Sequence, residues 1–277
     1  MARRAAAVND KGGVGRTLLI RLFAEYLARW HDLNVLMVDL DHQAILSRRV
    51  GFDMWGRDAE LPNAAGLFDR RIQAGDAADF IHPIRWDHER FPWAARIHII
   101  PGHEALQDVE EDGHGNPSGR VRRALDGADD GYDVTLFDTR PDFGKRSQAA
   151  WAASHDLFGV TEPWRDEMEG VARLLQRVLD FRDDLDNKEL DIAGIIINEF
   201  NNPSEHIRNN IAKLERAATA QRVWTDCPLP NRRFITEQMS TGEPFAAMTN
   251  VKNTAAIDAA VEPLIKKFLE VTGVGDA

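Results

Sequence analysis

The feature that most constrains this chain is a glycine-rich loop near its N-terminus. A short apolar run, residues 5–8, precedes the loop, and apolar residues at helical spacing follow it from Leu18 to Trp30. This order predicts a strand, a glycine loop and a helix. In such a loop the backbone N–H groups can point inward at a phosphate, and the helix N-terminus adds the positive end of its dipole. The sequence therefore predicts a phosphate-binding loop within an α/β fold.

The residues of this loop suit a bound nucleotide, with two departures from the usual pattern. Glycines leave room for a phosphate and permit positive φ angles, and the hydroxyl of Thr17 is expected to contact Mg²⁺. The standard loop reads G-x-x-x-x-G-K-[ST], but Asp10 stands in place of the first glycine and Arg16 in place of the lysine. The residues assigned to the nucleotide are Gly12, Gly13, Val14, Gly15, Arg16 and Thr17.

Composition excludes several classes of protein. The 277 residues, 43% of them hydrophobic, are enough for one large α/β domain or two small ones. No apolar run approaches the roughly 18 residues that a membrane span needs, so a cytoplasmic protein is expected. The single cysteine, Cys227, allows no internal disulfide and no cysteine-built metal site within one chain. A net charge of −11 argues against a globally basic DNA-coating protein but leaves a local basic patch open.

Strands alternate with helices along the rest of the chain. This alternation predicts a doubly wound, mostly parallel sheet with helices on both faces. Further strands are expected at residues 34–41, 96–102, 132–138, 156–160, 192–198 and 222–225, and helices at 118–125, 166–181, 204–218, 234–239 and 253–271. Residues 110–117 are expected to form a polar loop.

Residues 53–95 are less regular than the rest of the chain. They hold Trp55, Trp86 and Trp93 among glycine, proline and charged residues, with a helix expected near 74–81. We interpret this segment as an insertion with its own small hydrophobic cluster. It is not expected to be a separate domain, so that residues 1–277 form a single domain.

Acidic residues end two of the expected strands. Asp39 and Asp41 follow the apolar run that begins at Asn34, and Asp138 ends a later strand. Ligands bind at the carboxyl ends of strands in open α/β sheets. Asp138 is placed where a P-loop ATPase holds Mg²⁺. Two acids at the other strand end could position an attacking water, although one of them could instead only cap the next helix.

Four motifs together resemble a known family. Residues 11–17 resemble the deviant Walker A loop, K-G-G-x-G-K-[ST], of the ParA/MinD group of P-loop ATPases. Residues 39–43 are similar to its D-x-D-P-Q motif, with His42 in place of proline. Residues 132–141 are similar to Y-D-x-x-x-x-D-T-P-P, with Arg140 in place of the first proline, and residues 161–163 match T-E-P. The resemblance covers most of the chain except residues 53–95.

The resemblance implies roles for individual residues around ATP or ADP and Mg²⁺. Lys11 would reach across a nucleotide-sandwich homodimer to the phosphates of the partner subunit. Asp41 would orient or activate the attacking water, and Asp39 would lie near the magnesium ion. Asn198 would hydrogen-bond the adenine, and Pro230 belongs to a segment that would run over the base.

Arg16 keeps the positive charge of the loop lysine but not its geometry. A compact ammonium fits between two phosphates, whereas a planar guanidinium is larger and binds oxygens as a fork. With Lys11 and Asp41, Arg16 is assigned to the catalytic group. Two outcomes remain open, which are slow hydrolysis with intact binding and a nucleotide-binding protein without hydrolysis.

The resemblance also implies partners. In this family an ATP-bound dimer binds DNA non-specifically and a ParB-like partner stimulates hydrolysis, so that a plasmid or chromosome is moved or spaced and the protein associates with the nucleoid. Basic residues in the last third of the chain could contact DNA or could form a solvated surface of mixed charge, because Glu205 and Glu215 lie among them. These are Arg208, Lys213, Arg216, Arg222, Arg232 and Arg233.

Two other classes of protein share sequence features with this chain, namely membrane-attached ATPases and small-molecule ligases. Membrane attachment is not expected, because acidic residues offset Lys266 and Lys267 in the final helix. A small-molecule ligase of the dethiobiotin or cobyrinate amide synthase type has a related loop and sheet, and residues 53–95 could supply its pocket for an organic acid. A partition ATPase should associate with DNA in an ATP-dependent way, whereas a ligase should turn over ATP only with its acid.

Overall fold

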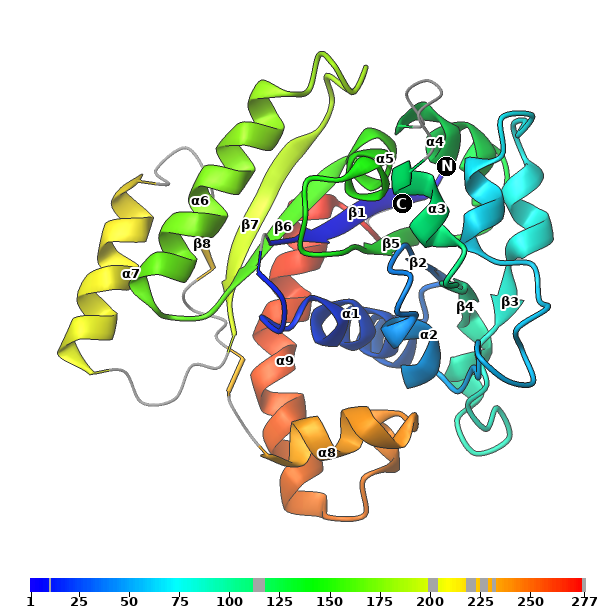
Figure 1. The fold of residues 1–277 in the computed structure, drawn as a ribbon. Helices are drawn as coiled ribbons and strands as arrows, with labels where there is room; N and C mark the ends of the chain where they lie inside the picture. The colour runs from blue at the N-terminus through cyan, green and yellow to red at the C-terminus, as the bar shows by residue number, and fades with distance from the viewer. Residues whose placement is uncertain are drawn as a thin grey trace.

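The computed structural model describes residues 1–9, 11–111, 118–198, 204–217, 223–224, 229–230 and 233–275. Its centre is an eight-stranded sheet in the order β3-β4-β2-β5-β1-β6-β7-β8 (Figure 1). Neighbouring strands are parallel except for β3, which runs antiparallel to β4. The strands are β1 Arg3–Val8, β2 Val35–Asp39, β3 His82–Pro83, β4 Ile97–Ile100, β5 Val134–Asp138, β6 Asp156–Thr161, β7 Asp191–Ile197 and β8 Val223–Trp224. The predicted fold class is confirmed.

Helices connect these strands. They are α1 Arg16–His31, α2 Ile45–Arg49, α3 Leu106–Glu111, α4 Ser118–Leu125, α5 Lys145–Ala153, α6 Arg165–Asp180, α7 Glu205–Ala217, α8 Arg233–Thr241 and α9 Val251–Thr272. Short 3₁₀ helices are η1 Ala64–Phe68, η2 Asp76–Phe80, η3 Pro92–Arg96 and η4 Phe245–Ala247. The helix predicted at 118–125 has those bounds, and the other predicted helices are displaced by a few residues at their ends. Glu110 and Glu111 end α3 where a polar loop was predicted, and residues 112–117 lie outside the described residues.

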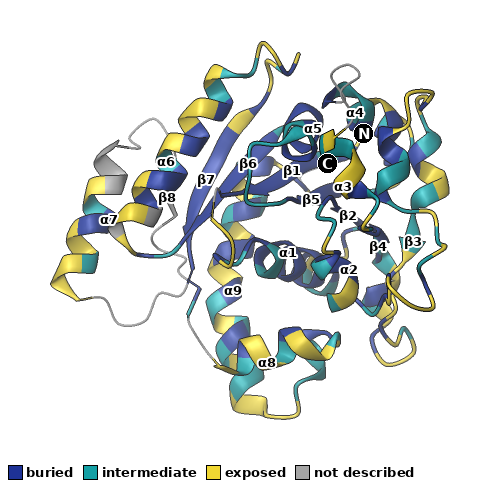
Figure 2. Ribbon diagram, in the orientation of Figure 1, coloured by how far each residue is buried: buried dark blue, intermediate teal, exposed yellow. Residues whose placement is uncertain are grey.

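The sheet separates two hydrophobic layers. Successive strand residues point to opposite faces, so Ala5 and Ala7 of β1 face one layer and Ala6 and Val8 face the other. The first layer contains α1, α2, α8 and α9, and the second contains α4, α5 and α6. Figure 2 shows the strands buried between these layers, with exposed residues on the outer sides of α6 and α8. The carboxyl ends of the central strands therefore form one edge between two covered faces.

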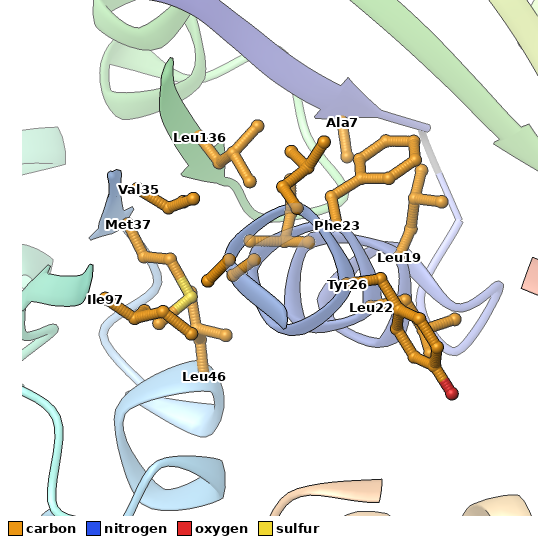
Figure 3. Packing of buried hydrophobic residues seen from close by; sticks show 14 of the residues in the cluster. Ala7, Leu19, Leu22, Phe23, Tyr26, Val35, Met37, Leu46, Ile97 and Leu136 are labelled. Carbon is orange, nitrogen blue, oxygen red and sulfur yellow. The ribbon is translucent and has the colours of Figure 1, made fainter. Parts of the chain in front are cut away.

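Helix α1, which directly follows the glycine loop, is largely buried. Leu19, Leu22 and Phe23 are fully buried and pack beneath β1, β2 and β5 (Figure 3). Burying each such side chain contributes about 1.5–3 kcal/mol. This packing fixes the N-terminus of α1 against the carboxyl end of β1, which is where the loop lies.

Residues 53–95 differ from their prediction in two ways. The helix predicted at 74–81 is only the 3₁₀ helix η2. The expected separate cluster is wrong, because Trp86 and Phe91 join the layer that contains α1 whereas Leu67 and Phe68 join the opposite layer. The segment passes over the sheet edge at β3, and its apolar side chains extend both existing layers.

Candidate nucleotide-binding site

The glycine loop follows β1 and ends at α1. Gly13 and Gly15 have φ angles of 85° and 101°, in the left-handed region that glycine adopts without a steric penalty. Gly15 is the N-cap of α1, and no side chain of the described residues caps this helix end. The first backbone N–H groups of α1 therefore remain free of a side-chain cap, as an anion site at a helix N-terminus requires.

Two asparagines hold the loop in place. The amide nitrogen of Asn9 donates to the carbonyl of Val160, and its oxygen accepts from the backbone N–H of Lys11 at 2.6 Å. The amide nitrogen of Asn198 donates to the carbonyl of Val14 at 2.9 Å. Both asparagines are buried, so the loop is fastened to the ends of β6 and β7. Sequence reasoning missed Asn9, although its place directly after the first strand was a usable signal.

Asn198 also explains why residue 15 is glycine. A Cβ at Gly15 would lie 2.3 Å from the Asn198 amide nitrogen, which is closer than any real contact. The adenine contact expected for Asn198 stays a prediction, since its amide nitrogen bonds the loop. Pro230 lies beside it, because the N–H of Leu229 donates to the carbonyl of Ile197 at 3.1 Å.

Thr17 and Asp138 meet directly beneath the loop. The Thr17 hydroxyl donates to Asp138 Oδ2 at 2.7 Å. Asp138 Oδ1 is buried and has no hydrogen-bond partner among the described residues. Asp39 pairs with Asp138 in the register of β2 and β5, so a second carboxylate lies beside the first. An orphaned carboxylate oxygen, a hydroxyl and a neighbouring carboxylate are the hard oxygen donors that Mg²⁺ prefers, so these residues fit the predicted magnesium site.

The two carboxyl groups are held in unfavourable surroundings. Burial, and then the neighbouring Asp138, raise the pKa of Asp39 to about 8. Burial raises the pKa of Asp138 to about 6, while the Thr17 hydrogen bond and the charge of Arg16 act in the opposite direction. A divalent cation at this position would reverse both shifts, because it favours the ionised form of each carboxylate.

Ser47 and Gly102 support Asp39, and sequence reasoning found neither. Asp39 Oδ2 accepts from the backbone N–H of Ser47 at 3.0 Å and from its hydroxyl at 2.7 Å. The Ser47 hydroxyl in turn accepts from the N–H of Gly102 at 2.9 Å. A Cβ at Gly102 would lie 2.7 Å from the carbonyl oxygen of Asp41, so this position requires glycine. From the sequence alone, Gly102 is only the last residue of the strand expected at 96–102.

Asp41 lies outside the buried pair. Its side chain is 20% exposed, and Oδ1 accepts from the backbone N–H of Gln43 at 3.0 Å. Asp41 thus lies at the mouth of the site, where a carboxylate can reach a water. Lys11 is exposed at the start of the loop, so its side chain can reach beyond its own subunit.

Arg16 is turned beneath the loop. Its residue is only 8% exposed, and Nη1 donates to the backbone carbonyl of Asn9. This bond joins the first residue of α1 to the residue that follows β1. In this chain the cation of the loop therefore braces the loop from below.

The basic residues considered for DNA binding are dispersed. Arg208 and Lys213 are exposed on α7, whereas Arg233 is on α8 and pairs with Glu237 at 2.7 Å. Figure 1 shows α7 and α8 in separate parts of the molecule. The Arg216 side chain, Arg222 and Arg232 lie outside the described residues, as do Cys227 and Asn231.

Comparisons with known proteins agree with this geometry. A family model described as an AAA domain matches residues 2–192. The chromosome-partitioning ATPase Soj of Thermus thermophilus is 30% identical over 248 residues, which are 88% of this chain and 87% of Soj.

The chain belongs to the ParA/MinD family of P-loop ATPases.

Solved structures share the fold of this ParA/MinD-family chain. An ATP complex of McdA from Cyanothece has a TM-score of 0.75 and 17% identity over 95% of this chain and 96% of McdA. Cobyrinic acid a,c-diamide synthase of Mycobacterium smegmatis, with ADP and magnesium, has a TM-score of 0.68 and 19% identity over 87% of this chain and 93% of the synthase. At these identities the likeness concerns the fold alone. Structural neighbours of the family thus hold ATP or ADP and magnesium.

Among the described residues of this family member, no group of three or more His, Cys, Asp or Glu side chains could hold a metal by itself. Within the same residues, no helix has the length and hydrophobicity to span a membrane.

Proposed function

We propose that this chain, as a single domain of residues 1–277, is an ATP-dependent dimerisation switch that partitions or positions DNA cargo and hydrolyses ATP slowly. The observation that carries the proposal is the contact between Thr17 and Asp138 beneath the glycine loop, next to an unpartnered, buried carboxylate oxygen. A hydroxyl and a carboxylate so placed fit a nucleotide with its magnesium ion better than any structural role.

The residues of the site divide the work of phosphoryl transfer to water. Backbone N–H groups of the loop and of the α1 N-terminus bind the phosphates. Thr17 and Asp138 would hold the magnesium ion, which would neutralise charge on the phosphate oxygens. Asp41, at the mouth of the site, orients the attacking water. Arg16 is bonded to the loop backbone, so the phosphates lack the usual loop cation, and slow hydrolysis follows.

The proposed partners are a second copy of the chain, non-specific DNA and a ParB-like activator. Lys11 is exposed on the loop, as a residue that enters a partner subunit must be. The similarity to Soj, whose name describes chromosome partitioning, supports a DNA cargo. We propose a cytoplasmic protein that associates with the nucleoid when it holds ATP.

A ligase is the second candidate, because cobyrinic acid a,c-diamide synthase shares the fold. Such an enzyme needs a second pocket that accepts an organic acid. A pocket of about 500 Å³ does lie within residues 53–95, but Asp69, Asp76 and Asp79 line it with Arg71 as its cation. This excess of negative charge disfavours an anionic substrate, so the partition function is preferred.

The test is ATP hydrolysis by the purified protein with and without duplex DNA. Slow turnover that rises with DNA, and that falls in Lys11→Ala but not in Lys252→Ala, is the expected result. Lys252 is an exposed lysine on α9 and serves as the matched control. No ATP-dependent dimer and no response to DNA would contradict the switch, and turnover that appears only with an added organic acid would favour a ligase.

A further inference from the structure

The two proline positions at which the chain departs from the family motifs meet in space. Arg140 Nη1 lies 2.9 Å from His42 Nδ1, and His42 Nδ1 lies 3.4 Å from Asp41 Oδ1. Asp39 and Asp138 are paired in the sheet register, and Asp41 and Arg140 each follow two residues later. Asp41, His42 and Arg140 thus form a continuous row of side chains across the mouth of the cation site.

The segment that carries Arg140 lies against the glycine loop. Pro141 Cγ would be 3.9 Å from a Cβ placed on Gly12, which is ordinary contact distance. The Arg140 side chain is 33% exposed, and it pairs at 3.4 Å with Asp142, whose side chain is 35% exposed. An exposed pair of this kind is worth little. The guanidinium of Arg140 is therefore available at the edge of the loop, where the far end of a bound triphosphate must lie.

The position of Arg140 matters because Arg16, the other arginine of the site, is bonded to the backbone beneath the loop. Arg16 is buried and donates to the carbonyl of Asn9 beneath the loop. A guanidinium binds two phosphate oxygens as a fork, and a cation at the terminal phosphate stabilises the charge that develops there.

We propose that Arg140 contacts the terminal phosphate of bound ATP and that His42 is the positioning residue that holds Arg140 beside Asp41. The inference rests on the proposed function, since it names a further residue of the same site. It assigns to Arg140, after the end of β5, the phosphate contact within one subunit that Arg16 does not make.

His42 can do this only as a neutral imidazole. Nδ1 must accept a hydrogen bond from Arg140, and a protonated ring has no acceptor. The charged groups that face the ring are Asp41, Arg140, Asp142 and Arg146. Nε2 then carries the ring proton, and it lies 2.7 Å from Gln43 Nε2, so the Gln43 amide must be flipped for its oxygen to accept that proton. Burial and then Arg140 lower the pKa of His42, which keeps the ring neutral at pH 7. Arg146, whose Nη1 lies 3.4 Å from Nδ1, also disfavours a second positive charge.

The experiment compares the affinities of the full-length protein for ATP and ADP, each with Mg²⁺, by calorimetry. Arg140→Ala should lower the affinity for ATP by about 10-fold or more and the affinity for ADP by less than about twofold. The reason is that only ATP has the phosphate that Arg140 contacts. Arg122→Ala is the matched control, since Arg122 is also 33% exposed and pairs with an exposed acid, Asp186, at 3.1 Å. Its variant should change neither affinity.

Two variants of His42 test whether it positions Arg140. His42→Ala should reproduce the loss of ATP preference, whereas His42→Asn keeps an acceptor near the position of Nδ1 and should retain it. As the pH falls from 7.5 to 5.5, the natural protein should lose more of its ATP preference than His42→Asn does, because Asp39 and Asp138 titrate in both proteins and His42 in only one. An equal decline in His42→Asn would overturn the positioning role.

The possible failures are distinguishable. If the natural protein binds neither nucleotide, the proposed function and this inference both fall. If it binds both with Mg²⁺ and Arg140→Ala leaves the ratio of the two affinities unchanged, only this inference falls. The ADP affinity of each variant shows that it is folded.

Discussion

The sheet has a cluster of buried charged side chains at each end of its central strands. At the amino end, Arg4 of β1 is 2% exposed and donates to both carboxylate oxygens of Asp129, at 2.7 and 2.9 Å. The Thr135 hydroxyl donates to Asp129 as well, at 2.9 Å. At the carboxyl end, Asp39 and Asp138 are equally buried and side by side, with one oxygen of Asp138 unpartnered among the described residues.

The difference distinguishes a structural cluster from a binding site. At the amino end, the opposite charges of Arg4 and Asp129 pair with each other. No ligand is needed to neutralise them. Two adjacent buried carboxyl groups at the carboxyl end cannot both ionise without raising the free energy of the folded protein, unless a cation binds. The fold keeps this unfavourable pair because α1 and the neighbouring strands hold it in place.

Breaking the amino-end cluster should have the largest effect on stability. Arg4→Ala leaves Asp129 buried without its cation, which costs about 3–5 kcal/mol of unfolding free energy. Chemical denaturation measures this change. Arg122→Ala is the control, because Arg122 pairs with Asp186, whose side chain is 91% exposed, and the loss of this pair should cost less. The nucleotide affinity of the folded variant should be unchanged, and a parallel loss of affinity would contradict the division into two clusters.

Removing a charge from the carboxyl-end pair should instead increase the free energy of unfolding. Asp138→Asn keeps an acceptor for Thr17 but cannot ionise. In the natural protein the raised pKa of Asp138 means that its contribution to stability is present below pH 4 and is lost as the pH rises through about 6. The nucleotide-free variant should therefore be more stable above pH 6, by on the order of 1–3 kcal/mol.

Thermal unfolding of the natural protein and the Asp138→Asn variant from pH 4 to pH 8 measures this gain. The two curves should converge at the acidic end and separate as the pH rises. A variant that is less stable at pH 8 would show that Asp138 is a structural residue.

A substitution at Gly102 tests whether Ser47 and Gly102 hold Asp39 in place. Its effect on the free energy of unfolding should be smaller than that of Arg4→Ala. Gly102→Ala places a Cβ 2.7 Å from the Asp41 carbonyl and 2.8 Å from Asp39 Cγ. We expect a loss of about 1–3 kcal/mol and about 10-fold slower hydrolysis, because both acids shift. Gly119→Ala is the control, since open space surrounds it within α4 and alanine favours a helix. Unchanged hydrolysis in Gly102→Ala would contradict the role given to this support.

Arg16→Lys should change stability least. Its hydrogen bond to the Asn9 carbonyl is lost, at a cost of about 1 kcal/mol. Hydrolysis should rise, because an ammonium can reach between the phosphates. Steady-state turnover measures the change, and a further fall would show that the guanidinium itself serves the reaction.

The sequence predicted those parts of the site that are encoded locally. The glycine loop, Thr17, Asp39 and Asp138 each follow from a strand end beside a distinctive pattern. Gly102 could not be assigned, because its role depends on β4 lying next to β2 in the sheet. The contact between His42 and Arg140 likewise joins residues that are separated by 98 positions.

The packing of residues 53–95 was mispredicted for a similar reason. Three tryptophans in an irregular segment indicated a local cluster. Whether Trp86 extends an existing layer depends on the antiparallel pairing of β3 with β4 at the sheet edge, and spacing along the chain does not reveal that pairing.

The most direct test of the account is calorimetric titration of the natural protein with ATP, with and without Mg²⁺. If the unfavourable carboxylate pair exists to hold a cation, ATP should bind with magnesium and should bind at least about 10-fold more weakly after chelation. Equal affinity in both conditions, or no binding in either, would contradict the claim that Asp39 and Asp138 form a magnesium–nucleotide site.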